Sequence, residues 1–220
     1  SDNFNPNQLN WFSVVTEDIL GLKTRSSFTA NEINLPPESS RIISIDYDLD
    51  SMVVNWEPNG DYDFKNYTIL YSTNQFSGYS PLHQILENDQ TRLILNEFDP
   101  TIENWFKVKT EDHWALFSEG APTSNQIDPL PSASEIQSLD YDLDSMRIVW
   151  NKCSDEDFLS YNLLQSFSEN GEYNLIYTSN YHSDTTYLLD EFDPTMENWF
   201  KVQTTDVWSQ EVVGEAMVSE

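Results

Sequence analysis

The sequence predicts an all-β protein in which seven-stranded β-sandwiches follow one another along the chain. Two observations support this prediction: a long internal repeat, and short apolar runs separated by turn residues within each repeat. The segment EFDPTIENWFKV at 97–108 returns as EFDPTMENWFKV at 191–202, and DYDLDSM at 46–52 returns at 140–146. Both pairs have the same offset of 94 residues, so one unit is repeated without an insertion.

The repeat divides the chain into three parts. The motifs FNP at 4–6 and NWF at 10–12 resemble FDP and NWF one repeat later, so residues 1–33 are expected to be the C-terminal part of a preceding repeat. Complete repeats are expected at 38–126 and 132–220, after short proline-containing joints. We therefore expect sandwiches strung end to end, in a chain taken from a longer array.

Seven strands are expected in each complete repeat, because short runs rich in β-branched and aromatic residues lie between turn residues. In the sixth strand Phe106, Val108 and Thr110 share the face expected to meet the core, while Trp105 lies on the outer face with its lysine neighbours. In the second repeat Asn170-Gly171 predicts a two-residue hairpin loop. The strands expected in the first complete repeat are Ile42–Ile45, Met52–Glu57, Asn66–Ser72, Leu82–Glu87, Thr91–Asn96, Trp105–Glu111 and Phe117–Thr123.

Several of these motifs resemble the fibronectin type III family. Asn55-Trp56-Glu57-Pro58 is similar to its second-strand signature, in which a core Trp precedes a Pro by two residues. The run YTILY at 67–71 is similar to the third strand, and FDP at 98–100 followed by Trp105-Phe106 resembles the approach to the sixth. The resemblance covers both complete repeats and implies immunoglobulin-like β-sandwiches from an extracellular protein. The Asn- and Asp-rich style of the sequence is similar to that of bacterial surface proteins.

The sequence departs from the family pattern at the sixth strand. The family usually places a Tyr there, whose hydroxyl bonds back to the preceding turn, but Phe106 and Phe200 hold the inward positions here. Two alternatives remain: the indole N–H of Trp105 and Trp199 supplies the missing donor, or packing alone holds this corner.

The charge of the chain excludes several partners. Ten Lys and Arg stand against 38 Asp and Glu, which gives a net charge of −28. A surface of this sign repels nucleic-acid phosphates and anionic membranes, and no apolar run is long enough to insert into a bilayer. Divalent cations, basic proteins and neutral glycans fit the sign, although acidity can also serve solubility alone. Cys153 is the only cysteine, so no intrachain disulfide is possible.

The aspartate triplets DYDLD at 46–50 and 140–144 are the most suggestive motifs for a metal, because alternate carboxylates can converge on one calcium ion. An EF-hand would need Gly at the sixth position, where Ser51 and Ser145 stand, and the residues that follow are typical of a strand. An EF-hand is therefore excluded. Either another calcium site forms here, or the aspartates cap a solvated turn.

Other aspartates are expected to gather at one end of each sandwich, where the loop after the second strand approaches the loop after the sixth. Such a cluster costs repulsion when empty, and a calcium ion beside the interdomain joint would relieve it. Turn formation and solubility are the alternative explanation. The residues concerned are Asp61, Asp63 and Asp112 in the first complete repeat and Asp155, Asp157 and Asp206 in the second.

Two pairs of tryptophans are candidates for contact with a partner. Trp114 and Trp208 lie in the loop after the sixth strand, and loop-tip aromatics often mediate interactions. Trp105 and Trp199 on the outer sheet face could stack on sugar rings or could shield the sheet. The three histidines have no His one repeat away and no metal spacing, so surface positions are expected for them.

The sequence contains no catalytic or nucleotide-binding motif, so we expect neither an enzyme nor a cofactor, calcium apart. We expect a structural spacer of a secreted or cell-surface protein, whose partners are other domains of the same longer chain. One alternative is an adhesin module that binds glycans or surface proteins. Another is the subunit of an extracellular fibre, assembled through residues 1–33, which cannot bury their apolar face alone.

Overall fold

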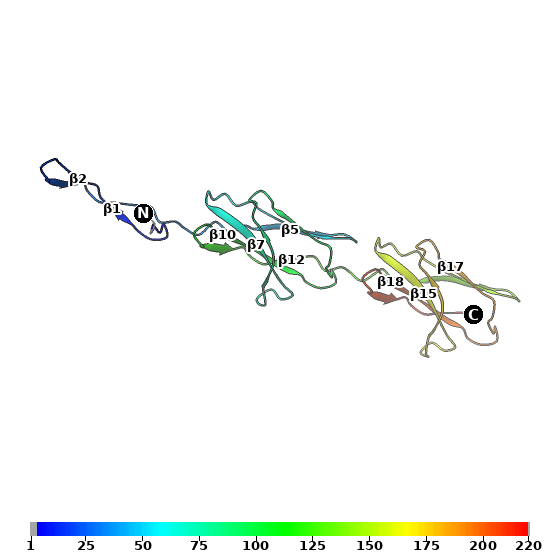
Figure 1. The fold of residues 1–220 in the computed structure, drawn as a ribbon. Coiled ribbons are helices and arrows are strands. Elements are labelled where there is room, and N and C mark those ends of the chain that lie inside the picture. The colour runs from blue at the N-terminus through cyan, green and yellow to red at the C-terminus, as the bar shows by residue number, and fades with distance from the viewer. Residues whose placement is uncertain (1–3, 220) are drawn as a thin grey trace. The chain divides into compact units, whose positions relative to one another are not determined.

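The computed structural model describes residues 4–219, which form β-strands joined by turns and loops. No helix in this range has the length and apolar character that a membrane-spanning segment requires. The chain forms two compact units: unit 1 comprises Ser1–Phe98 and Ile102–Gln126, and unit 2 comprises Asp99–Thr101 and Ile127–Glu220. The strands of each unit are drawn in Figure 1.

Unit 1 contains a sandwich of two antiparallel sheets. The first sheet has three strands in the order β5-β6-β9, and the second has five strands, in which β11-β10-β7-β8 are neighbours and β12 also pairs with β10. Their bounds are β5 Ile42–Tyr47, β6 Met52–Trp56, β7 Phe64–Ser72, β8 Ser80–Ile85, β9 Arg92–Leu95, β10 Trp105–Asp112, β11 Phe117–Glu119 and β12 Thr123–Ser124.

Unit 2 repeats this topology. The three-stranded sheet has the order β13-β14-β17, and the five-stranded sheet has the order β16-β15-β18-β19, with β20 also pairing with β18. Their bounds are β13 Ile136–Tyr141, β14 Met146–Trp150, β15 Phe158–Ser166, β16 Asn174–Ser179, β17 Thr186–Leu189, β18 Trp199–Asp206, β19 Glu211–Val213 and β20 Met217–Val218.

The strand order in each unit confirms the predicted fold class. Strands one, two and five of the repeat form one sheet, and strands three, four, six and seven form the other. This is a Greek-key sandwich of the immunoglobulin-like, fibronectin type III-like kind. Trp56 and Trp150 lie inside it, only 1% and 2% exposed, and each indole meets the edge of a buried tyrosine, Tyr67 or Tyr161. The tryptophans expected in the core are therefore there.

The sixth strand of unit 1 has the two faces that its alternation predicts. Phe106, Val108 and Thr110 are at most 1% exposed, and the first two pack in the core. Trp105 is half-buried on the outer face, where its indole N–H donates to the carboxylate of Glu103 at 3.0 Å. The indole thus bonds locally and does not hold the corner before the strand.

The corner before β10 is held by a buried asparagine, which neither of the two sequence-based alternatives included. Asn104 is 3% exposed; its Nδ2 donates to the carbonyl of Ile102 at 3.0 Å, and its Oδ1 accepts from the Tyr71 hydroxyl at 3.1 Å. Its backbone N–H donates to Oδ1 of Asn125 at 2.7 Å. Asn198 holds the same position in unit 2, so a side-chain amide replaces the family's tyrosine hydroxyl in both.

Two details of the strand prediction are wrong. The seventh strand, expected as Phe117–Thr123, is divided at Gly120, whose N–H bonds to the carbonyl of Val108 at 2.8 Å while the chain passes close to the carbonyl of Ser40. The connection at Asn170-Gly171 is longer than a two-residue loop, because Gly171 ends a turn that starts at Ser168 instead of lying at its centre.

Residues before unit 1's sandwich form a short hairpin, enclosed by a second strand pair, and many of their apolar side chains are exposed. β1 (Trp11–Phe12) pairs with β4 (Thr29–Ala30), and β2 (Val15–Glu17) pairs with β3 (Lys23–Arg25). Phe12 is 54% exposed, whereas its counterpart Phe106 is 1% exposed. The expectation that residues 1–33 cannot bury their apolar face alone is confirmed for the described residues; what covers this face stays a prediction.

Candidate functional site

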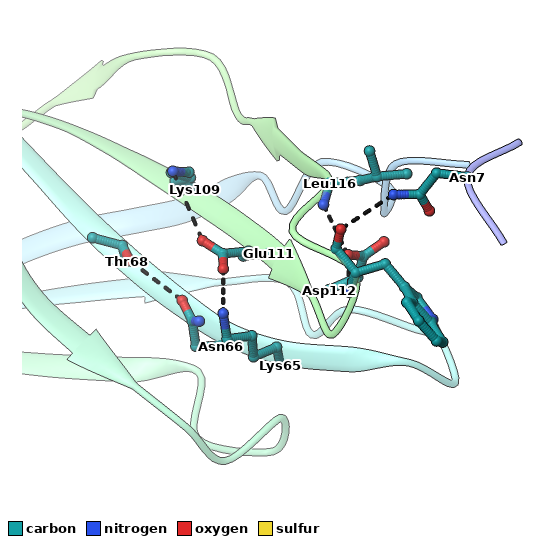
Figure 2. Close-up of polar contacts among 9 residues, drawn as sticks. Asn7, Lys65, Asn66, Thr68, Lys109, Glu111, Asp112 and Leu116 are labelled. Atoms are coloured by element: carbon teal, nitrogen blue, oxygen red, sulfur yellow. Dashed lines mark hydrogen bonds and ion pairs between the residues drawn. The ribbon is translucent and has the colours of Figure 1, made fainter. Parts of the chain in front are cut away.

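The β10–β11 loop of unit 1 is organised by the carboxylate of Asp112, which is completely buried. Its Oδ1 accepts hydrogen bonds from the backbone N–H groups of Trp114 at 2.8 Å and Leu116 at 2.9 Å (Figure 2), and Ala115 between them has a left-handed φ of 63°. Its Oδ2 accepts from Nδ2 of Asn34 at 2.9 Å. Asp112 therefore shapes the loop and also binds the residue that enters the joint.

The other two aspartates expected at this end, Asp61 and Asp63, do not form a three-carboxylate group with Asp112 in the described part of unit 1. Asp61 accepts at Oδ2 from the backbone N–H of Glu38 at 2.9 Å, which fixes the chain just before the sandwich. Asp63 accepts through its backbone carbonyl from the N–H of His113 at 3.0 Å, and its Oδ2 is a buried oxygen with no hydrogen-bond partner among the described atoms. The expected convergence of the two loops is present, but no three carboxylates of unit 1's described part meet.

In unit 2 the corresponding end does bring three carboxylates together. Asp128, Asp157 and Asp206 each offer an oxygen within 4.8 Å of the others, and Asp128 and Asp206 are buried. Asp157 and Asp206 were expected there, but Asp128 was missed. It is the counterpart of Asn34, and the repeat extended across the joint could have revealed it.

Asp155, also expected in this cluster, lies apart from it. Its carboxylate accepts from the hydroxyl of Ser132 at 3.1 Å and from the Cys153 thiol at 3.2 Å. Burial opposes ionisation of Asp155, but these bonds and the backbone N–H of Ser132 outweigh it and hold its pKa below the ordinary value. Like Asp61 in unit 1, Asp155 fixes the start of its sandwich.

The three-carboxylate group of unit 2 carries an electrostatic cost. Burial first, and then the charges of Asp128, Asp206 and Asp155, raise the pKa of Asp157. Part of the repulsion is relieved by Gln210, whose Nε2 donates to Oδ2 of Asp128 at 2.9 Å and of Asp206 at 3.2 Å. In the described residues this is the only acidic group with metal-ligand spacing. One oxygen from each of three carboxylates falls short of the six to eight oxygens that calcium takes, so second carboxylate oxygens, backbone carbonyls or water would have to supply the rest.

In each aspartate triplet the middle aspartate, Asp48 or Asp142, caps a turn. Oδ1 of Asp48 accepts from the N–H groups of Asp50 at 2.9 Å and Ser51 at 2.8 Å, and these bonds lower the pKa of Asp48. Asp142 makes the same bonds in unit 2, and its pKa is lowered in the same way. The turn-capping alternative is therefore confirmed for Asp48 and Asp142.

The candidate contact tryptophans are tied to the scaffold. Trp114 is 42% exposed, and Phe4 meets its ring at 6.4 Å between centroids and an interplanar angle of 88°. The backbone N–H of Trp208 donates to Oδ1 of Asp206 at 2.9 Å, as its counterpart does in unit 1. On the outer face, Trp199 bonds to Glu197 through its indole, which favours the shielding role.

A shallow groove lies away from these aspartates, on the outer face of the five-stranded sheet of unit 1. Its volume is about 580 Å³, and its lining includes Tyr79, Leu82, His83, Lys109 and Glu119. A groove of this size with an aromatic ring and several polar groups falls within the range of small-ligand sites. It is open, however, and Lys109 lies over the ring of Phe117 at 4.1 Å, beside the sheet surface.

No family model matches this chain, and no curated protein matches it. Among solved structures it is similar to the FN1–FN3 domains of chicken CNTN1, with 11% identity, coverage of 95% of this chain and 76% of that one, and a TM-score of 0.36. It is also similar to a two-domain fibronectin type III segment of chicken tenascin, with 16% identity, 83% and 97% coverage, and a TM-score of 0.35.

The strand order inside each unit defines the class of protein. The chain is a tandem arrangement of fibronectin type III-like β-sandwiches, as the resemblance of its second, third and sixth strands implied.

Proposed function

We propose that this chain is a non-enzymatic structural spacer within a secreted or cell-surface protein. The observation that supports this proposal is the use of the candidate side chains inside the scaffold. Asp61 and Asp112 in unit 1 accept hydrogen bonds from the backbone of their own unit. Side chains that are occupied in fixing loops are poorly placed to bind a substrate, and they serve to keep a module rigid.

The charge of the chain fits the same role. With a net charge of −28, successive modules and neighbouring chains repel one another. Such repulsion opposes collapse and non-specific association, which suits a protein that holds other domains away from a surface. We infer that its partners are the other domains of the same longer chain.

Mechanical unfolding and ligand screening together test the proposal. A spacer should unfold in two separate events under force, each releasing roughly 30 nm for about 90 residues at about 3.4 Å per extended residue. The same protein should show no saturable binding on a glycan array. Saturable binding to a sugar or turnover of a substrate would contradict the spacer role.

An adhesin module is the second candidate, and the groove on unit 1 is the observation that favours it. The groove's polar residues differ between the repeats: His83 and Lys109 are replaced by Tyr177 and Gln203 in unit 2. A ligand of this groove would therefore bind one site per chain. Tyr79→Ala should then remove any glycan binding that the array detects, while the equivalent Tyr173→Ala in unit 2 should leave it intact.

A further inference from the structure

We propose that the β10–β11 loop of unit 1 is a docking surface for the preceding repeat, with Trp114 as its central contact. The inference rests on the proposed spacer function and names the partner of one of its surfaces. The partner is the Phe-x-Pro segment that precedes the sixth strand of a repeat of the same kind, here Phe4–Pro6. Trp114 is then a contact residue, as its position at a loop tip suggests, but its partner is protein of the same chain.

Contacts within the sandwich fix the conformation of the β10–β11 loop independently of this segment. Asp112 binds the N–H groups of Trp114 and Leu116, and the left-handed Ala115 turns the chain between them. The loop is also tied to the opposite loop, since the N–H of His113 donates to the carbonyl of Asp63. A surface that is already ordered loses little conformational entropy when a partner binds.

The preceding segment contacts this loop through one apolar and one polar interaction. The ring of Phe4 meets the ring of Trp114 edge-on, at 6.4 Å and 88°. Asn7, which is labelled in Figure 2, donates from Nδ2 to the backbone carbonyl of Trp114 at 3.2 Å. An edge-to-face aromatic pair and a hydrogen bond together fix both distance and orientation.

The joint residue Asn34 binds the same two elements. Its backbone N–H donates to the carbonyl of Pro6 at 2.8 Å, and its Nδ2 donates to the buried carboxylate of Asp112 at 2.9 Å. The preceding segment is therefore held directly by Trp114 and indirectly through Asn34. Two independent connections to one loop restrict rotation about the joint more than a single covalent link does.

Distance measurements between two spin labels test this surface. We would place labels on Thr24→Cys in β3 and Ser80→Cys in β8, both exposed, in the full chain with the buried Cys153 replaced by Ser. A docked joint gives a narrow distance distribution. Trp114→Ala and Phe4→Ala should each broaden the distance distribution. Because Phe4 lies outside the sandwich, its replacement cannot unfold the sandwich.

Phe76→Ala provides the matched control, because this aromatic residue is 87% exposed on a different loop of unit 1. It should keep the parent's narrow distribution. A broad distribution in the parent chain, or a narrow one in both Trp114→Ala and Phe4→Ala, would overturn the proposal. The spacer function fails by a different measurement, the detection of a ligand, which would leave these distributions unchanged.

Discussion

Asn34 donates from Nδ2 to Oδ2 of the buried Asp112 at 2.9 Å, which joins the start of unit 1's sandwich to the loop after its sixth strand. One repeat later the same two positions hold Asp128 and Asp206, and the donor between them is Nε2 of Gln210. The residue at Gln210's position in unit 1 is Leu116, which has no side-chain donor. The same connection thus joins an amide to a carboxylate in unit 1 and two carboxylates, through Gln210, in unit 2. The stabilities of the two units should therefore respond differently to pH.

The first prediction concerns Asp157, whose pKa is raised by burial and by the charges of Asp128, Asp206 and Asp155. Because the folded-state pKa lies above the unfolded one, the folded unit binds the proton more tightly. The stabilisation of unit 2 by the protonated carboxyl of Asp157 is fully present below the unfolded-state pKa, near 3.8. It is lost as the pH rises through the folded-state pKa. At neutral pH, Asp157→Asn should therefore raise the unfolding midpoint of unit 2.

The measurement is thermal unfolding followed by the NMR signal of the Trp150 indole, between neutral pH and the ordinary pKa of aspartic acid. The difference in midpoint between Asp157→Asn and the parent should shrink as the pH falls. Asp63→Asn, at the same position of unit 1, is the control and should leave the midpoint of unit 2 unchanged. A difference that is constant across the pH range would contradict the assignment.

The second prediction concerns calcium binding by the aspartates of unit 1. In unit 1 the amide of Asn34 occupies Oδ2 of Asp112, while Asp61 is bonded to the backbone of Glu38. An ion that binds only the folded state raises the unfolding midpoint, so the midpoint reports binding. We expect millimolar calcium to leave the unfolding midpoint of unit 1 unchanged. The signal to follow is the indole of Trp56, and an upward shift of its transition would refute this expectation.

Much of the fold could be predicted because the repeat and the strand pattern are local properties of the sequence. The alternation at Phe106, Val108 and Thr110 fixes which face is buried, and the structure confirms it. The break at Gly120 could not be predicted, because it depends on how close the chain passes to the carbonyl of Ser40, a residue far away in sequence. Contacts of this kind exist only after the sheets have packed.

The candidate site was less predictable for a related reason. Turn residues identify the loops on which Asp112 and Asp206 lie, but hydrogen-bond partners decide whether a carboxylate is a ligand or a scaffold element. Asn34 and Asp128 lie in the proline-containing joints, outside the regular strand pattern, so strand periodicity gives no indication of them. Asn34 and Asp128 are equivalent positions of the two joints, and only an alignment of the joints shows that an amide in one replaces a carboxylate in the other.

The third prediction tests the corner before the sixth strand. Asn104→Ala removes the donor to the Ile102 carbonyl and the acceptor of the Tyr71 hydroxyl in a buried position. Each hydrogen bond is worth about 0.5–1.5 kcal/mol, so the loss of these two bonds should cost unit 1 about 1–3 kcal/mol of stability in chemical denaturation. Asn198→Ala should destabilise unit 2 by a similar amount and leave unit 1 unaffected. Equal stability of the parent and Asn104→Ala would show that packing holds the corner.

The fourth prediction concerns Gly120, where the seventh strand is divided. A Cβ at this position would collide with the backbone carbonyl of Ser40, which cannot move without disturbing the sandwich. Gly120→Ala should therefore destabilise unit 1 by about 1–3 kcal/mol, the usual cost of overpacking a well-packed interior. Gly60→Ala is the matched control, because a Cβ there meets nothing within 4 Å.

Denaturant unfolding of unit 1, followed through the Trp56 core, compares the two glycine variants. Gly60→Ala should unfold at the parent's midpoint or slightly above it, since Ala restricts the unfolded chain more than Gly does. Gly120→Ala should unfold earlier, with the midpoint of unit 2 unchanged. If both variants were equally stable, the close approach of residues 40 and 120 would not be what divides the strand, and a local turn preference would have to account for it.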